Sequence, residues 1–165
     1  MSELKKKDLI YIEINDQIDI STFCCESDEL NKFFHEKSKK NNQYLLSKVY
    51  ICLNFKKNEI AGFITLSNYL LRLADSKKYG IQKVPGILVG RLAVDNKYRG
   101  MSLGNDLLRF TFEICNKVKK YSGCRLLVVE IKKKDPILEY MKEFGFEDLH
   151  SSKIFHYLGI DLMDA

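Results

Sequence analysis

The beginning of the chain shows a helical pattern after a strand-like segment. Residues 9–14 alternate loosely between apolar and polar side chains, which predicts a short strand. A helix is predicted from Asp28, because Ser27 can cap its first turn and apolar residues then recur at helical spacing. Its apolar face consists of Leu30, Phe33, Phe34 and the stem of Lys37.

Two strand-like runs follow, at residues 47–55 and 59–71. Both are rich in β-branched and aromatic residues, and the polar stretch at 56–58 between them is typical of a hairpin turn. The two runs are therefore expected to be antiparallel neighbours. Residues 72–86 are polar and contain Gly80 and Pro85, which predicts a loop with a helical turn.

The second half of the chain alternates between strand-like and helix-like patterns. Residues 86–94 form an apolar run that predicts a long central strand, and residues 103–118 follow with an apolar face at helical spacing. A buried strand at 125–131, a helix at 136–143 and a final strand at 153–160 complete the predicted elements.

These elements predict a mixed α/β fold in a single domain that covers residues 1–165. An antiparallel N-terminal sheet joined to a strand-helix-strand unit implies one mixed sheet with flanking helices. No apolar run approaches the ~18 residues that a membrane span needs, so no membrane partner is expected. The N-terminus lacks the apolar core of a secretory signal, and the cytoplasm is the expected compartment.

Positive charge is concentrated in the middle of the chain. The 165 residues carry a net charge of +5, yet residues 32–134 hold 22 Lys and Arg against seven Asp and Glu. Residues 8–29 contain seven acidic residues and no Lys or Arg. A basic middle suits a phosphate-rich partner such as a nucleotide cofactor or a nucleic acid. A lysine-rich solvated surface is the alternative.

The five cysteines indicate a reducing compartment rather than a metal site. Cys24 and Cys25 are adjacent, and the other three stand alone among apolar residues. Neither CxxC nor a Cys/His cluster with zinc spacing occurs, so no bound metal is expected. We interpret the cysteines as reduced core residues.

The polar segment at residues 95–102 is the strongest candidate for chemistry. It joins the predicted central strand to the following helix and carries Arg99, Gly100 and Ser102, with Gly104 just beyond. Free backbone N–H groups and the helix dipole at such a position favour a phosphate or pyrophosphate. The spacing matches neither a Walker loop nor GxGxxG. The pattern alone leaves open a tight strand-to-helix turn without a ligand.

Residues 90–95, 98–104 and 107–108 resemble motif A of the GNAT superfamily of acyl-CoA-dependent N-acyltransferases. The superfamily pattern is Arg or Gln, two residues, Gly, one residue, then Gly or Ala. Ser102 occupies the position of the middle Gly in this chain. The pair Gly145-Phe146 resembles the closing Gly-Phe of the family.

The resemblance implies the GNAT fold, a mixed α/β sheet in which the central strand, fourth in the order, splays from its parallel neighbour, the fifth. Acetyl-CoA is then the expected cofactor. The backbone of Leu92, Ala93 and Val94 would pair with the pantetheine arm, and one of these N–H groups would polarise the thioester carbonyl. The loop would hold the pyrophosphate through Arg99, Gly100, Met101, Ser102, Leu103, Gly104 and Asn105.

The resemblance also bears on the general acid. Many family members place a Tyr four residues before the Gly of the Gly-Phe pair, where its hydroxyl can protonate the leaving thiolate. That position is Met141 in this chain, and Tyr140 precedes it by one residue. A one-residue shift turns a helical side chain by about 100°. Tyr140 is the candidate general acid, and packing of its ring is the alternative.

Nearly the whole chain is similar to the acetyltransferase toxins of bacterial type II toxin-antitoxin modules. Residues 23–24, 30–31, 49–67 and 90–95 carry this similarity. It implies transfer of the acetyl group to the α-amino group of aminoacyl-tRNA, which blocks translation. A small antitoxin protein is then an expected partner, and a homodimer is a further one.

An RNA-linked acceptor makes seven basic residues candidates for RNA contacts, because phosphate neutralisation dominates such binding. Arg91 carries the most weight, since it lies in an apolar strand beside the expected reaction centre. The others are Lys32, Lys39, Lys40, Arg72, Lys77 and Lys78. Two alternatives remain: an enzyme that acetylates a small-molecule amine or a protein amino group, and a degenerate domain that binds coenzyme A without turnover.

Overall fold

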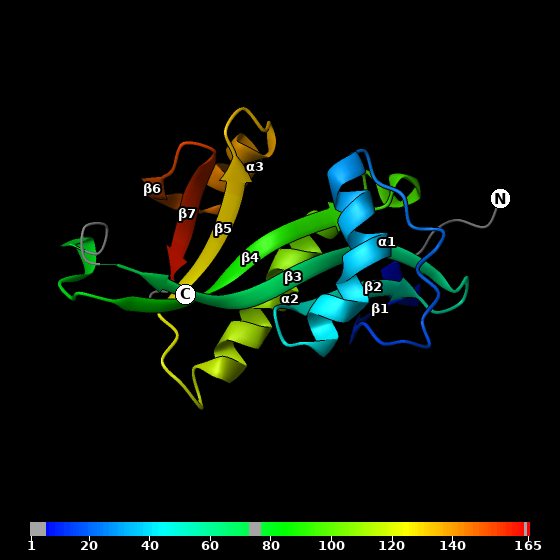
Figure 1. The fold of residues 1–165 in the computed structure, drawn as a ribbon, viewed down its shortest axis with the longest axis horizontal. Coiled ribbons are helices and arrows are strands. Elements are labelled where there is room, and N and C mark those ends of the chain that lie inside the picture. Colours follow the sequence, from blue (N-terminus) through cyan, green and yellow to red (C-terminus); the bar gives the residue numbers. More distant parts are fainter. Residues whose placement is uncertain (1–5, 73–76, 164) are drawn as a thin grey trace. The chain divides into compact units, whose positions relative to one another are not determined.

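The computed structural model describes residues 6–72, 77–163 and 165. None of the described helices is both long enough and apolar enough to cross a bilayer. The elements labelled in Figure 1 are β1 (Leu9–Glu13), α1 (Asp28–Gln43), β2 (Lys48–Asn54), β3 (Glu59–Leu71), β4 (Val84–Val94), α2 (Leu103–Val118), β5 (Leu126–Lys132), α3 (Ile137–Phe144), β6 (Glu147–Ser151) and β7 (Phe155–Asp161). Short 3-10 helices add η1 (Lys6–Asp8), η2 (Lys77–Tyr79) and η3 (Asn96–Tyr98).

The strands are hydrogen-bonded in the order β1-β2-β3-β4-β5-β7-β6. Strands β4 and β5 run parallel, whereas β1 with β2, β2 with β3, β5 with β7 and β6 with β7 pair antiparallel. The mixed α/β fold predicted from the sequence is therefore confirmed. The chain divides into two compact units, the first formed by residues 1–66 and 91–110 and the second by residues 67–90 and 111–165.

Aromatic rings form the core of the first unit. Phe23, Phe34 and Phe63 are at most 2% exposed, and the ring centroids lie 4.7 Å apart for Phe23 and Phe34 and 4.5 Å apart for Phe34 and Phe63. Each buried Phe contributes about 1.5–3 kcal/mol. Helix α1 packs against β2 in this unit (Figure 1). The Ser27 hydroxyl accepts a hydrogen bond from the Leu30 N–H at 3.2 Å, which confirms the predicted N-cap.

The parallel strands form the centre of the second unit. Residues Gly86–Val89 of β4 pair with Leu126–Val129 of β5, and both strands continue past this register. A Cβ atom at Gly86 would lie 2.5 Å from the Leu126 carbonyl oxygen, so only glycine allows this approach. Helices α2 and α3 meet through Phe112 and Phe144, whose ring centroids are 6.1 Å apart.

Strands β4 and β6 differ from the sequence-based expectation. Strand β4 begins at Val84 rather than at residue 86 and includes Pro85, whose carbonyl accepts a hydrogen bond from the Arg125 N–H at 2.8 Å. The sequence pattern does not predict β6, because its five residues are mostly polar. This strand forms at the edge of the sheet by pairing with β7, and a half-solvated antiparallel edge tolerates polar residues.

Candidate active site

The loop after β4 is anchored by the buried side chain of Tyr98, which is 1% exposed. Its hydroxyl accepts a hydrogen bond from Asn54 Nδ2 and donates one to Glu59 Oε2, each at 2.9 Å. Burial, together with the bond to the Glu59 carboxylate, raises the pKa of Tyr98 to about 12. The phenol therefore stays protonated at neutral pH and ties the loop to the β2–β3 hairpin.

The end of β4 lies close to β3. The Asp95 N–H donates to the Ala61 carbonyl at 2.8 Å, and a Cβ atom at Gly62 would lie 2.8 Å from the Ala93 carbonyl oxygen. Ala93 is buried, while Leu92 and Val94 are half-buried. The three residues expected to face the pantetheine arm thus lie on the last part of β4, directly before the loop.

Two loop residues adopt left-handed backbone conformations. Gly100 has a φ of +77° and Ser102 a φ of +59°. This region costs an L-residue about 1–2 kcal/mol, and glycine avoids that cost. The position at which the family pattern has its middle glycine therefore requires a glycine-like backbone here, and Ser102 adopts it with strain.

The loop continues directly into α2, which begins at Leu103. The Asp106 N–H donates to the Ser102 carbonyl at 3.2 Å, and the N–H groups of Leu103 and Gly104 belong to the first turn, whose N–H groups point out of the N-terminal end of a helix. A helix N-terminus preceded by alternating left-handed residues presents converging N–H groups to an anion. This geometry fits the pyrophosphate of coenzyme A.

Arg99, the basic residue of the loop, is exposed and forms an ion pair with Glu26. Glu26 lies just before α1, and the Arg99 guanidinium holds the pKa of its carboxyl below the ordinary value. The side chain of Arg99 thus reaches toward α1 in this structure. A pyrophosphate at the N-terminus of α2 would compete with Glu26 for the same guanidinium.

Arg91 packs on the aromatic core of the first unit. Its guanidinium carbon lies 3.7 Å from the ring centroid of Phe33, which explains how a charged residue is accommodated in this apolar strand. Arg91 is half-buried in this position. The stacking accounts for its place in the sequence without requiring an RNA contact.

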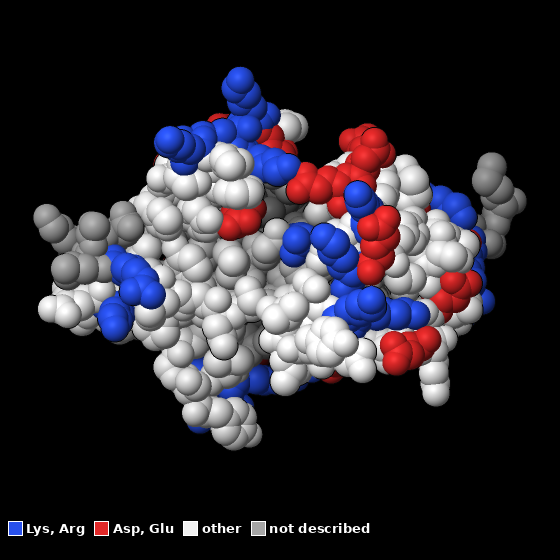
Figure 2. Space-filling view, in the orientation of Figure 1, with Lys and Arg blue, Asp and Glu red and all other residues white. Residues whose placement is uncertain are grey.

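The three candidate lysines of α1 differ from one another. Lys32 and Lys40 are exposed, whereas the Lys39 ammonium donates to the carbonyls of Ile18 at 2.7 Å and Asp16 at 3.3 Å. Lys39 therefore secures the segment before α1. Over α1, Figure 2 shows basic side chains interspersed with acidic ones, so this face of the helix is not uniformly positive.

The remaining RNA candidates belong to the second unit. Arg72 is exposed just after β3, and Lys78 is exposed and pairs with Glu147 at 2.7 Å. The side chain of Lys77 lies outside the described part of the chain. The seven candidates are thus divided between the two units.

The candidate general acid lies on α3. Tyr140 is half-buried, whereas the neighbouring Met141 is 2% exposed and packs in the interior of the second unit. The helix ends at Gly145, whose φ of +119° requires glycine, and the Phe146 N–H donates to the Met141 carbonyl at 3.1 Å. Met141 is therefore a core residue of α3, and Tyr140 is the residue of this pair with an accessible side chain.

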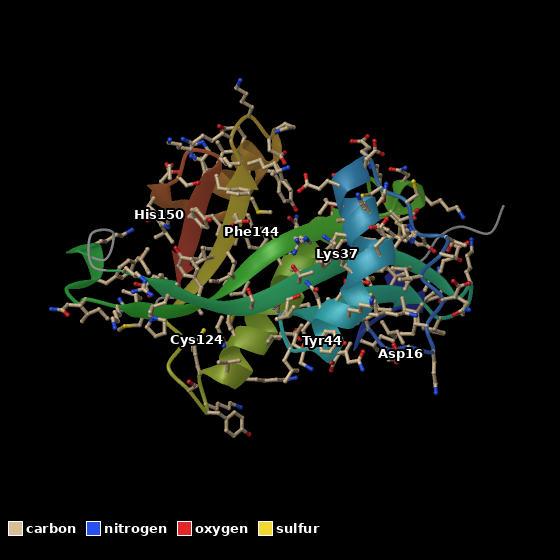
Figure 3. The ribbon with its side chains drawn as sticks, in the orientation of Figure 1. Asp16, Lys37, Tyr44, Cys124, Phe144 and His150 are labelled. Carbon is tan, nitrogen blue, oxygen red and sulfur yellow. The ribbon has the colours of Figure 1, made fainter. Side chains whose placement is uncertain are left out.

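A polar aromatic cluster in the second unit has no counterpart in the sequence-based predictions. The Tyr157 hydroxyl donates to Glu130 Oε2 at 2.7 Å, and the Tyr157 ring stacks on His150 with centroids 4.4 Å apart. His150 Nε2 and the Tyr69 hydroxyl lie 2.9 Å apart. Figure 3 labels His150 at the edge of this unit. The cluster joins β3, β5, β6 and β7, and only the cross-strand register reveals it.

Comparisons with known proteins agree with this geometry. The sequence profile described as "Acetyltransferase (GNAT) family" matches residues 14–146. A tRNA-acetylating toxin of Mycobacterium tuberculosis (strain ATCC 25618 / H37Rv) is 26% identical over 138 residues, which is 81% of each chain.

Solved structures of two proteins have the same fold. A mutant of the AtaT toxin bound to the C-terminus of the antitoxin AtaR matches with a TM-score of 0.83 and 20% identity over 95% of each chain. A mutant of KacT matches with a TM-score of 0.83 and 22% identity over 94% of this chain and 96% of that one. With the GNAT fold, a loop that fits a pyrophosphate and a family match over most of its length, the chain belongs to the acetyltransferase (GNAT) family and uses acetyl-CoA as its acetyl donor.

Proposed function

We propose that this acetyltransferase modifies the α-amino group of aminoacyl-tRNA and acts as the toxin of a toxin-antitoxin module. The observation that carries the proposal is the 26% identity to a tRNA-acetylating toxin over 81% of both chains. The fold of AtaT complexed with acetyl-methionyl-tRNAfMet, which matches with a TM-score of 0.82, is consistent with it.

Within this proposal the loop holds the phosphates and β4 aligns the acetyl group. Acetyl-CoA supplies an activated acyl group as a thioester. The N–H groups at the start of α2 and the guanidinium of Arg99 bind the pyrophosphate, joined by the rest of the loop from Gly100 to Asn105. An N–H group of Leu92, Ala93 or Val94 stabilises the negative charge that develops on the thioester oxygen.

Acetyl transfer forms a C–N bond and breaks a C–S bond. The neutral amine attacks the thioester carbon, its proton passes to solvent, and the departing thiolate receives a proton from the Tyr140 hydroxyl. The α-amine of an aminoacyl ester is less basic than a lysine side chain, so a substantial fraction is already neutral at physiological pH. A dedicated general base is therefore unnecessary for this acceptor.

The charge of the chain supports a nucleic-acid acceptor. A segment with 22 Lys and Arg against seven Asp and Glu attracts phosphates well beyond those of one cofactor. Among the seven candidates for RNA contacts, the exposed Lys32, Lys40 and Arg72 fit this role best, because Lys39, Lys78 and Arg91 have partners within the protein.

The same proposal extends to the organisation of the protein. Residues 1–165 act as a single catalytic domain in the cytoplasm, where charged tRNA is available. A small antitoxin protein neutralises the enzyme, as the complex of AtaT with the antitoxin AtaR suggests for this fold. Self-association into a homodimer is a further part of the proposal.

The decisive experiment incubates the purified protein with labelled acetyl-CoA and a mixture of charged and uncharged tRNAs. Label that appears only on charged tRNA supports the proposal. Transfer to polyamines, small amines or peptide amino groups, with none to tRNA, would establish the alternative acceptor class. Binding of acetyl-CoA without transfer to any amine would identify a degenerate domain.

A further inference from the structure

Asp95 occupies the junction between β4 and the coenzyme A loop. The residue is 5% exposed and follows Val94, the last residue of β4. Its two carboxylate oxygens accept hydrogen bonds from different parts of the chain. Oδ1 accepts from the Lys97 N–H at 2.8 Å, and Oδ2 accepts from the Cys24 N–H at 2.9 Å, 71 residues away in sequence.

The partner segment at Cys24 is itself held firmly. The Asn96 N–H donates to the Cys24 carbonyl at 2.9 Å, which closes a two-bond clamp between this segment and the start of the loop. Asn31 of α1 then fixes the next residue, because its Oδ1 accepts from the Cys25 N–H at 2.8 Å and its Nδ2 donates to the Cys25 carbonyl at 2.9 Å. The Asp95 carboxylate is thus fastened to α1 through a short rigid path.

Both partners of this carboxylate are N–H donors, so the site needs two acceptor oxygens. An asparagine amide offers one acceptor oxygen and places an NH2 group against a donor, which costs one of the two bonds. The Asp95 backbone adds two further bonds, from its N–H to the Ala61 carbonyl at 2.8 Å and from the Tyr98 N–H to its own carbonyl at 2.9 Å. The residue therefore sets the direction in which the chain leaves β4.

We propose that Asp95 is a positioning residue for the phosphates of acetyl-CoA. By clamping Lys97 and Cys24 together, its carboxylate fixes the start of the turn that carries Arg99 and leads to the N–H groups of α2. It contacts no reacting atom. The inference rests on the proposed coenzyme A loop and assigns the residue that orients it.

The test measures the dissociation constants of two acetyl donors, acetyl-CoA and acetyl-pantetheine, for Asp95→Asn and for the wild type. We expect the dissociation constant of acetyl-CoA to rise about tenfold, since small misplacements of binding groups have large effects. Acetyl-pantetheine, which lacks the pyrophosphate and the nucleotide, should bind the variant and the wild type within about twofold, because its contacts lie on β4. The kcat at saturating acetyl-CoA should change little.

Asp8→Asn is the matched control. Asp8 is 8% exposed, lies in the same unit and pairs with Lys56 at 3.1 Å, so the substitution removes a buried charge that is paired with the β2–β3 hairpin rather than with the loop. It should lower the melting temperature without changing the dissociation constant of acetyl-CoA. If Asp95→Asn does not fold, Asp95→Ser takes its place, because a serine oxygen can still accept from the Lys97 N–H but is too short for the Cys24 bond.

Two results would overturn the inference. An unchanged dissociation constant for acetyl-CoA shows that the clamp does not serve the loop, and an equal loss for acetyl-CoA and acetyl-pantetheine shows a general structural role. The variant Arg99→Gln distinguishes a wrong positioning role for Asp95 from a wrong assignment of the phosphate site to the loop. If Arg99→Gln weakens acetyl-CoA binding and Asp95→Asn does not, only the positioning role is wrong; if neither variant weakens it, the proposed phosphate site is wrong.

Discussion

The guanidinium of Arg91 lies 3.7 Å from the ring centroid of Phe33, which joins β4 to α1 in the first unit. Such a cation–π contact contributes about 0.5–2 kcal/mol when it is partly desolvated. Arg91 stands out in the sequence as a charged residue within an apolar strand, and its contact with Phe33 gives a structural reason for that position.

We predict that Arg91→Met and Phe33→Leu are coupled. Each substitution should lower the free energy of unfolding, and the double variant should lose about 0.5–1 kcal/mol less than the sum of the single losses. Urea denaturation of the four proteins measures this coupling. Additive losses would show that the two side chains contribute independently.

A second prediction concerns the left-handed Ser102, whose φ is +59°. Ser102→Gly should raise the free energy of unfolding by up to about 1 kcal/mol, because relief of strain outweighs the greater chain entropy of glycine. Ser122→Gly is the control, since Ser122 has no positive φ and should lose about 0.5 kcal/mol. Thermal denaturation distinguishes the two. Equal losses in both variants would contradict the strain at Ser102.

The third prediction tests the general acid. Tyr140→Phe should lower kcat about 100-fold and leave the KM for acetyl-CoA nearly unchanged, because proton donation acts in the transition state. Tyr121→Phe alters a tyrosine that is 90% exposed and should leave kcat unchanged. Steady-state kinetics with charged tRNA gives both values. An unaltered kcat in Tyr140→Phe would remove this residue from the mechanism.

The fourth prediction separates two adjacent lysines of α1. Lys40→Gln should weaken tRNA binding and reduce the salt dependence of the binding constant by about one unit of slope, as expected for loss of one phosphate contact. Lys39→Gln should lower the free energy of unfolding by about 1 kcal/mol through loss of its bonds to backbone carbonyls. Filter binding at several salt concentrations and urea denaturation measure the two effects. Weaker tRNA binding by Lys39→Gln, together with lower stability of Lys40→Gln, would contradict the RNA contact proposed for Lys40.

The fifth prediction uses the pair formed by Arg125 and Asp161 in the second unit. Two bonds, at 2.6 and 2.8 Å, hold the pKa of the Asp161 carboxyl below its ordinary value. This stabilisation is present above the pKa of the unfolded carboxyl and is lost as pH falls through the lower folded value. The free energy of unfolding should therefore decline in acid below about pH 4.

Asp161→Asn should lower stability at neutral pH by about 1 kcal/mol and show a smaller decline in acid. Asp16→Asn removes an exposed carboxylate and should retain the acid decline of the wild type. Denaturant titrations between pH 2 and 7 give the comparison. A parallel acid decline in Asp161→Asn and the wild type would show that this pair does not contribute to it.

Local patterns were sufficient for most helices and strands. Ser27 as N-cap, the start of α1 at Asp28 and the bounds of α2 follow from capping chemistry and apolar periodicity, which act within a few residues. Strand β6 could not be predicted from local patterns, because it is a strand through its pairing with β7 and not through its own composition. The hydrogen-bonded cluster of Glu130, Tyr157 and His150 likewise depends on cross-strand register.

The sequence by itself determined the fold class and the place of the polar loop after β4, because these depend on residue order and on chemistry within one turn of chain. Only the tertiary structure decided which residues hold that loop. Asp95 finds its second partner 71 residues away at Cys24, and Tyr98 reaches Asn54 and Glu59 on the hairpin. Such contacts form because polar groups that are buried together must hydrogen-bond to one another, and no local sequence pattern predicts which of them pair.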